Sequence, residues 1–168
     1  VVGAAGWEQQ LRTNQEEFSR RWVQRPDFLA EFPMSMNSNE FIDKLAANLG
    51  VAPLAPFERT IANESYTQTV EGRAATLRNV INLNSTYNAQ FNPGFVLSQY
   101  IGYLRRNPND APDFDYTGFD YWLAKMNSFS LPGEDVSNEQ TAIARVRRAE
   151  MVRAFILSLE YRGRFGQP

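Results

Sequence analysis

The stretch RAFILSLEYRGRFG, from Arg153 to Gly166, carries a pattern that occurs three times in this chain. An arginine is followed two positions later by an apolar residue and then by valine or isoleucine. An aromatic residue and a phenylalanine come next, four positions apart. The same order occurs in RRWVQRPDFLAEF (Arg20 to Phe32) and RNVINLNSTYNAQF (Arg78 to Phe91). Helical units that cannot bury their apolar face alone repeat in this way, so the pattern predicts helices that stack on one another.

The parts of this pattern suggest separate roles in packing. We expect the two consecutive apolar residues to hold a helix in the core, and the aromatic residue with its phenylalanine to dock the end of that helix against the next unit. The aromatic positions predicted to lie inside are Phe28, Tyr87 and Tyr161. Each arginine falls on a different face of its helix, where we expect it to pair with an acidic side chain.

Apolar residues recur at helical spacing over most of the chain, and strand-like alternation is nearly absent. The segment MNSNEFIDKLAANLG (residues 36–50) is a clear example, because Asn37 or Ser38 can cap a helix and Gly50 can end it. Its apolar stripe is Phe41, Ile42, Leu45 and Leu49. The spacing therefore predicts an all-α fold, a compact bundle of about seven helices.

The remaining helices are expected at comparable patterns. They are predicted at residues 11–25, 55–64, 69–83, 93–106, 117–128 and 138–162. The first ends before Pro26, because proline disfavours helix at Arg25, and the last is the longest. The predicted apolar face of the helix at 11–25 is Leu11, Phe18, Trp22 and Val23. That of the helix at 69–83 is Val70, Ala74, Leu77 and Ile81.

A second repetition supports a duplicated architecture. The segments FIDKLAANLGVAP and VLSQYIGYLRRNP both place apolar residues four apart before a proline: Phe41, Leu45, Leu49 and Pro53, and Val96, Tyr100, Leu104 and Pro108. We expect a single helical domain, 1–168, with a degraded copy of the unit at 17–91 and a better-preserved copy at 92–168. The alternative is that these spacings are the ordinary periodicity of a helical core.

The composition excludes several classes of function. With 43% hydrophobic residues the chain can build a core, and its net charge of −2 argues against nucleic acid as the main partner. It contains no cysteine and no histidine, which excludes disulfides, cysteine or histidine zinc ligands, and serine–histidine or cysteine–histidine hydrolysis. No apolar run is long enough for a membrane span. The opening VVGAAGWEQQ has no initiator methionine or signal pattern, so we expect a processed protein or a segment of a longer one.

The second half of the chain carries a more specific set of motifs. An aromatic-rich helix ends in Leu-x-Arg-x-Pro, a turn with aspartate and glycine follows, and then come a Tyr-Trp helix and a closing helix with Ser-x-Glu-Tyr. The residues are Tyr100, Leu104, Arg106, Pro108, Asp115, Gly118, Tyr121, Trp122, Phe155, Ser158, Glu160 and Tyr161. In these motifs residues 92–166 resemble the bacterial domain of unknown function four-two-one-four, with Leu-Arg-Arg in place of its usual Leu-Gly-Arg. A more distant similarity is to phycobilisome linker domains.

The resemblance implies a helical module found in large exported or cell-surface bacterial proteins. It implies no established activity and supplies no catalytic or cofactor-binding residues.

Three residues form a candidate calcium site. Asp113, Asp115 and Thr117, with Gly118 after them, match the first half of a calcium-binding loop, but Ala124 stands where the bidentate glutamate is needed. The alternative is a turn whose aspartate and threonine side chains cap the helix that follows.

The acidic residues of the same region also allow a catalytic hypothesis. Two carboxylates can hydrolyse a glycoside without histidine, cysteine or metal, provided that one has a raised pKa in a cleft. The candidates are Asp113, Asp115, Asp120, Glu134 and Asp135. The alternative is that they are ordinary surface acids.

Two further groups of residues are candidates for binding. Arg145, Arg147, Arg148 and Arg153 form either a phosphate-binding strip or a solvated helix face with pairs inside the helix. The aromatic residues near Trp122 either stack on sugar or peptide or, at Phe119, Trp122 and Met126, form a core stripe. Tyr103 and Tyr116 are the aromatic residues expected to be exposed.

These observations favour a non-catalytic helical interaction or scaffold module, part of a larger exported or surface-associated bacterial protein. Its partner is expected to be protein, with no cofactor, no nucleic acid and no membrane span. The alternatives are a carboxylate-based enzyme acting on glycans and a calcium-stabilised module.

Overall fold

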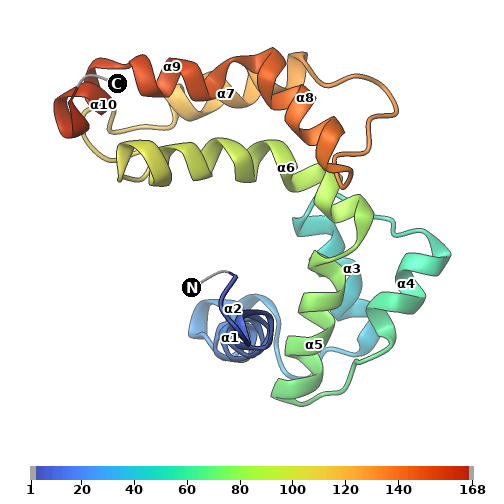
Figure 1. The fold of residues 1–168 in the computed structure, drawn as a ribbon. Helices are drawn as coiled ribbons and strands as arrows, with labels where there is room; N and C mark the ends of the chain where they lie inside the picture. The colour runs from blue at the N-terminus through green and yellow to red at the C-terminus, as the bar shows by residue number, and fades with distance from the viewer. Residues whose placement is uncertain (1–2, 167–168) are drawn as a thin grey trace. The chain divides into compact units, whose positions relative to one another are not determined.

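The computed structural model describes residues 3–166, and all regular structure in that range is helical (Figure 1). The elements are α1 (Trp7–Trp22), α2 (Pro26–Glu31), α3 (Ser38–Asn48), α4 (Pro56–Asn63), α5 (Val70–Ile81), α6 (Asn84–Gln99), the π-helical segment η1 (Tyr100–Leu104), α7 (Thr117–Ser128), α8 (Glu139–Ala149), α9 (Met151–Leu157) and α10 (Leu159–Phe165). The all-α prediction is confirmed. The predicted number of about seven helices is too low, since the described residues form ten α-helices.

The chain divides into two compact units, Val1–Thr86 and Tyr87–Pro168, called unit 1 and unit 2 below. Each unit has a hydrophobic core of its own. Since α6 begins at Asn84, its first turn lies at the division and its remaining turns belong to unit 2.

Unit 1 is organised around α5, which packs against α1, α3 and α4. Phe41 of α3 lies at the centre of an aromatic group, with the rings of Phe28, Phe32 and Tyr66 5.5–6.3 Å away between centroids. Arg73 of α5 is fully buried beside this group, with its guanidinium 4.6 Å from the Phe41 ring centroid. It donates hydrogen bonds to the main-chain oxygens of residues 32 and 33, which holds the loop after α2 in place.

Helix α3 agrees with its sequence signals. Asn37 is the N-cap: its side chain accepts a hydrogen bond from the Glu40 N–H at 3.1 Å, and the Glu40 carboxylate accepts one from the Asn37 N–H at 2.9 Å. Gly50, with φ of 69°, follows the last turn. The stripe is buried at Phe41, Ile42 and Leu45. Local capping and burial agree here, and the prediction is confirmed.

The predicted apolar face of the first helix is wrong except at Val23, which is buried just after α1, whereas that of α5 is confirmed except at Ile81. Leu11, Phe18 and Trp22 are exposed, and within α1 only Ser19 is buried, so the helix packs through a polar contact in which Arg78 donates to the Ser19 hydroxyl. In α5 the predicted Ala74 and Leu77 are buried and Val70 packs half-buried on the core, whereas Ile81 is exposed. The buried residues of α5 are Gly72, Arg73, Ala74, Thr76, Leu77 and Val80. A helix that contacts three others is covered on several faces, which a single stripe cannot describe.

Unit 2 is built on α6, η1, α7, α8, α9 and α10. Val96, Tyr100 and Leu104 are buried, as the four-residue spacing predicts, and they share a core with Met126 of α7 and Phe155 of α9. Figure 1 shows α6 running alongside α7 and α9, which bring these side chains together. The predicted stripe of α7 is also confirmed, since Phe119 and Trp122 pack on the same core.

Helix α6 starts earlier than predicted. The sequence suggested a start at Pro93, but Pro93 lies inside a helix that begins at Asn84. Asn92 is buried and donates hydrogen bonds to the Asn127 and Ser130 side chains, while Phe91 and Phe95 stack with centroids 6.0 Å apart. Packing on both sides of the proline therefore keeps the chain helical where local propensity disfavours it.

The predicted long helix at 138–162 is wrong. The chain breaks at Glu150, where φ is 52°, and again at Ser158, whose hydroxyl caps α10 by accepting from the Tyr161 N–H. The first break places Ala149 and Met151, on either side of it, in the core. A straight helix cannot direct two residues spaced two apart to the same side, so burial of both residues requires the kink.

The repeated pattern has a mixed outcome. In each copy the aromatic residue contacts the phenylalanine four positions later, at centroid distances of 4.6, 6.2 and 4.9 Å. Phe28 is buried as predicted and Tyr161 is half-buried, but Tyr87 is 48% exposed. Of the three arginines that begin the copies, only Arg20 pairs with an acid within residues 3–166, namely Glu71 at 3.9 Å.

None of the helices in the described range is both long and apolar enough to cross a bilayer.

Candidate functional site

The acidic turn before α7 is held by an arginine. Arg106 follows η1 in the chain. It donates to the Asp113 carboxylate at 2.6 Å and to the Glu160 carboxylate of α10 at 2.7 and 3.1 Å. The Arg106 side chain is only 6% exposed. The hydrogen bond to Glu160, together with Asp113, raises the pKa of Arg106, so the cation stays charged. These contacts tie the turn to the C-terminal helix.

The three calcium candidates make different contacts and do not converge on one point. The Asp113 carboxylate faces Arg106, and the Asp115 carboxylate accepts a hydrogen bond from the Thr117 N–H at 2.9 Å, at the start of α7. Thr117 is the first residue of that helix rather than its cap. Over residues 3–166 there is no group of three or more acidic side chains placed to hold a metal ion. Asp115 therefore forms a local turn immediately before the N-cap residue Tyr116, rather than a metal ligand set.

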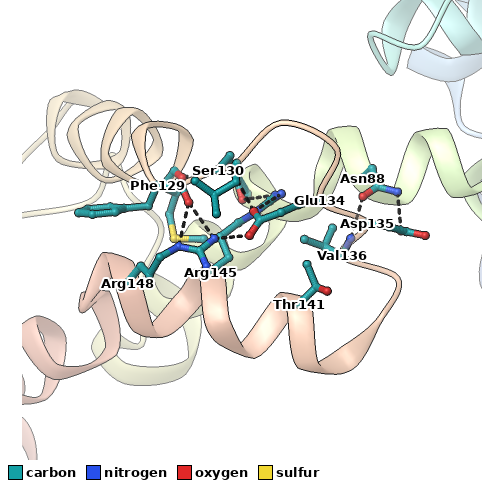
Figure 2. A network of polar contacts seen from close by, with 12 residues as sticks. Asn88, Phe129, Ser130, Glu134, Asp135, Val136, Thr141, Arg145 and Arg148 are labelled. Carbon is teal, nitrogen blue, oxygen red and sulfur yellow. Dashed lines mark hydrogen bonds and ion pairs between the residues drawn. The ribbon is translucent and has the colours of Figure 1, made fainter.

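A second ion-pair cluster joins the α7–α8 loop to α8 (Figure 2). The Glu134 carboxylate accepts from Arg145 at 3.1 Å and from Arg148, and Arg148 also donates to the Phe129 main-chain oxygen at 2.9 and 3.1 Å. Arg145 and Glu134 are 7% and 12% exposed. The expected pairs within helix α8 are therefore wrong for Arg145 and Arg148, which bind a loop acid instead.

The same loop is fastened to α6. Arg145 donates to the Asn92 side chain at 3.3 Å, and on the outer side the Val136 N–H donates to Asn88 at 2.8 Å (Figure 2). The Asn88 amide in turn donates to Asp135 at 2.9 Å. Buried polar groups in this cluster thus have partners from three elements, which fixes α8 against α6.

These contacts decide what the acids can do. The Leu131 N–H, Arg148 and Arg145 lower the pKa of Glu134 to about 2, against the effect of its burial. A general acid needs a raised pKa, so Glu134 is poorly suited to that role. Asp113 is also tied to a cation, and Asp120 is exposed on α7.

The aromatic candidates are placed differently from one another. Tyr116 is exposed, as predicted, with its ring edge against Phe119. Tyr103 is half-buried and packs on Tyr161 at 5.9 Å, so its predicted exposure is wrong. Tyr121 is exposed on α7 and lies against Trp122.

The most distinct surface feature of unit 2 is an open apolar groove, called the α8–α9 groove. It is bounded by α6, α8 and α9 and has a cavity volume of about 930 Å³. Its apolar wall includes Phe91, Phe95, Ile143, Val146, Ile156 and Leu157. Most of these side chains are half-buried, and Leu157 is 43% exposed.

Charged residues line the same groove at the break between the two helices. Arg147, Glu150 and Arg153 are all exposed and all lie on its lining. Within residues 3–166, the guanidinium groups of Arg147 and Arg153 make no hydrogen bond or ion pair. The four arginines predicted as one strip are therefore divided: two are structural and two are available at the groove.

Sequence reasoning missed this groove. Its apolar wall comes from helices far apart in the chain, and the kink at Glu150 that shapes it has no glycine or proline as a signal. Glu150 lies three positions from both Arg147 and Arg153, a spacing that favours ion pairs in a straight helix, so the sequence gives no hint that these two arginines are unpaired.

Unit 1 has a smaller open groove of about 480 Å³. Phe18 and Trp22 of α1, with stacked rings 5.6 Å apart, form one side, and Phe28 and Ile81 contribute from α2 and α5. Arg25 lies over the Trp22 ring and pairs with Asp27, so the charged rim of this groove is already neutralised in part.

No known protein family, curated protein or solved structure matches this chain significantly.

Proposed function

We propose that the chain is a non-catalytic helical interaction module whose unit 2 binds a partner protein in the α8–α9 groove. The observation that carries the proposal is an apolar groove of about 930 Å³ with two arginines at its lining that have no partner among the described residues. Apolar surfaces of this kind, bordered by charge, are typical of protein-binding sites.

The arrangement of the acids supports the same proposal. The alternative, glycan hydrolysis, needs two acids facing a cleft, one of them protonated. Asp113 and Glu134 are each paired with arginine. The lining of the α8–α9 groove includes none of the five candidate acids, Asp113, Asp115, Asp120, Glu134 and Asp135. Asp113, Asp115 and Glu134 are thus used to fasten the chain locally, and Asp120 lies exposed on α7.

We also propose that the two units arose by duplication of one helical module. Each copy of the repeated pattern spans the end of one helix and the start of the next, at α1–α2, α5–α6 and α9–α10. Each also keeps the contact between its aromatic residue and its phenylalanine. We propose that the units derive from a common helical module of the type that residues 92–166 resemble, in a bacterial protein that is exported or attached to the cell surface.

Site-directed photo-crosslinking tests the proposal. A photoreactive residue is placed at Leu157 in the groove or at Leu159, which is two positions further on, 86% exposed and outside the groove lining. Crosslinking to one protein is expected from position 157 alone. That protein should bind the purified chain, and unlabelled chain should compete with the crosslink whereas its Leu157→Glu variant should not.

Two results would contradict the proposal. The first is equal crosslinking from both positions, which indicates a nonspecific apolar surface. The second is release of reducing sugar from a glycan by the full chain, abolished in Asp113→Asn or Glu134→Gln, which would establish the enzyme instead.

A further inference from the structure

The chemistry of the α8–α9 groove narrows the class of partner. The groove is lined by a broad apolar wall from three helices and by three charged residues in the order Arg147, Glu150, Arg153. The inference below rests on the proposed function and concerns what occupies the groove.

The apolar wall suits a helix. Phe91 and Phe95 stand on α6, Ile143 and Val146 on α8, and Ile156 on α9. Wide grooves between helices accept the apolar face of an amphipathic helix, whose anchors recur at i, i+3, i+4 and i+7.

The wall is also well supported from behind. The guanidinium of the buried Arg145 lies 5.8 Å from the Phe91 ring centroid, and Arg145 itself is held by Glu134 and Asn92. Helices α6 and α8 are therefore fixed to each other beneath the groove, so little ordering of the groove is needed on binding.

The charged residues of the groove lining favour a partner with acidic side chains. Arg147 and Arg153 have no ion-pair partner in the described range, and with Glu150 they give the lining a net charge of +1. Acidic side chains at the edges of a bound helix would find these two cations and be steered toward them.

The charge pattern also distinguishes a helix from an anionic lipid. A single head group needs several donors that converge on one point, whereas here Glu150 separates the two arginines along the chain. A helix can meet alternating charges with separate side chains of its own.

We infer that the α8–α9 groove binds an amphipathic helix of a partner protein with leucine-like anchors on one face and acidic residues beside them, paired to Arg147 and Arg153. The apolar wall supplies most of the affinity, and the two arginines supply the preference for acidic helices.

Binding of two synthetic helices tests the inference on the full chain. Each has about 18 residues with leucine at helical spacing, and the flanking positions are glutamate in one and lysine in the other. The glutamate helix is expected to bind more tightly, with affinity falling as salt rises. The double variant Arg147→Glu with Arg153→Glu should weaken it by roughly tenfold or more and should bind the lysine helix better than the unsubstituted chain does.

Two control variants accompany this test. Arg12→Glu reverses an exposed arginine of α1 outside the groove, and Leu159→Glu is compared with Leu157→Glu. Of these three variants, only Leu157→Glu should weaken binding of the glutamate helix. Circular dichroism melts of every variant show that each is folded, and unchanged binding in a folded Arg147→Glu, Arg153→Glu variant overturns the inference.

Other occupants give different results. Equal affinity for both synthetic helices overturns the inference, as does self-association of the chain that Leu157→Glu abolishes, which assigns the groove to a second copy. Tight binding of oleate that Leu157→Glu abolishes, with neither synthetic helix bound, also overturns it, because that result assigns the groove to an anionic lipid. If neither helix binds while crosslinking from position 157 persists, the inference fails and the proposed function stands.

Discussion

Gly72 is a residue whose role the sequence does not reveal. It lies in the first turn of α5, where glycine is ordinarily unfavourable, but a Cβ at this position would come within 2.5 Å of the Thr67 main-chain nitrogen. The close approach of the loop before α5 therefore requires glycine here.

The substitution Gly72→Ala is expected to destabilise the chain by about 1–3 kcal/mol, because the loop at Thr67 must move. The matched control is Gly94→Ala in α6, where a Cβ meets nothing within 4 Å and the gain in helix propensity should stabilise by about 0.5–1 kcal/mol. Urea unfolding measures both. Stabilisation by both substitutions would contradict the packing at α5.

Glu134 predicts a dependence of stability on pH. Its pKa is about 2 in the folded chain and ordinarily 4.5, so its contribution to stability is fully present above pH 4.5 and is lost as the pH falls toward 2. In Glu134→Gln the unfolding midpoint should be lower at neutral pH, and its decline between pH 4.5 and 2 should be shallower than in the unsubstituted chain.

The control for this measurement is Asp120→Asn, which removes an exposed carboxylate of α7 that has no ion pair within residues 3–166. Its acid profile should follow that of the unsubstituted chain. An acid profile of Glu134→Gln that also follows it would show that the Arg145 and Arg148 contacts are absent in solution.

Residue identities predicted some roles better than others. Asn37 and Gly50 are local capping signals, and they were confirmed because a cap depends on its own turn alone. Arg145 and Arg147 are two positions apart and look alike in sequence, yet one is buried and paired and the other is exposed. That difference depends on Glu134, which a loop brings to Arg145.

At the scale of elements, the break between α8 and α9 is the feature with the greatest consequence. Glu150 adopts a left-handed conformation, which costs about 1–2 kcal/mol for a residue with a Cβ. The break is nevertheless favourable, since it allows Ala149 and Met151 to be buried and directs α9 along the groove.

The substitution Glu150→Gly is therefore expected to leave the free energy of unfolding unchanged or to raise it by up to about 1 kcal/mol, because glycine tolerates this conformation. Glu150→Val is expected to lower stability by about 1–2 kcal/mol, since a β-branched residue is strained there. Thermal melts of both variants measure the difference. A straight helix through residue 150 would give the reverse order.

The elements were predictable where the apolar stripe is the face that packs on the core, as in α3 and α7. Prediction failed in α1, where the apolar residues Leu11, Phe18 and Trp22 face outward and the contact with α5 is made by Ser19. It also failed at Pro93 and Glu150, where burial of neighbouring residues overrides local preference. Periodicity measures which residues are apolar, and tertiary contacts decide which of them are covered.

For the whole molecule, composition gave the class of protein but not its site. The absence of cysteine and histidine removes the commonest nucleophiles, bases and metal ligands, and the helical spacing gives the all-α fold. The α8–α9 groove appears only when α6, α8 and α9 are assembled. A site built from three segments has no motif, and its two arginines are distinguished by having no partner in the described part of the chain.

The central proposal is that the α8–α9 groove of unit 2 is the binding surface of this chain, and methyl NMR of the full chain titrated with the synthetic glutamate helix tests it most directly. The predicted result is saturable shifts at Ile143, Val146, Ile156 and Leu157, with the methyls of Leu131 and Leu159 unchanged. Shifts centred instead on Leu11 and Ile81, or equal shifts at Leu159 and Leu157, would contradict it.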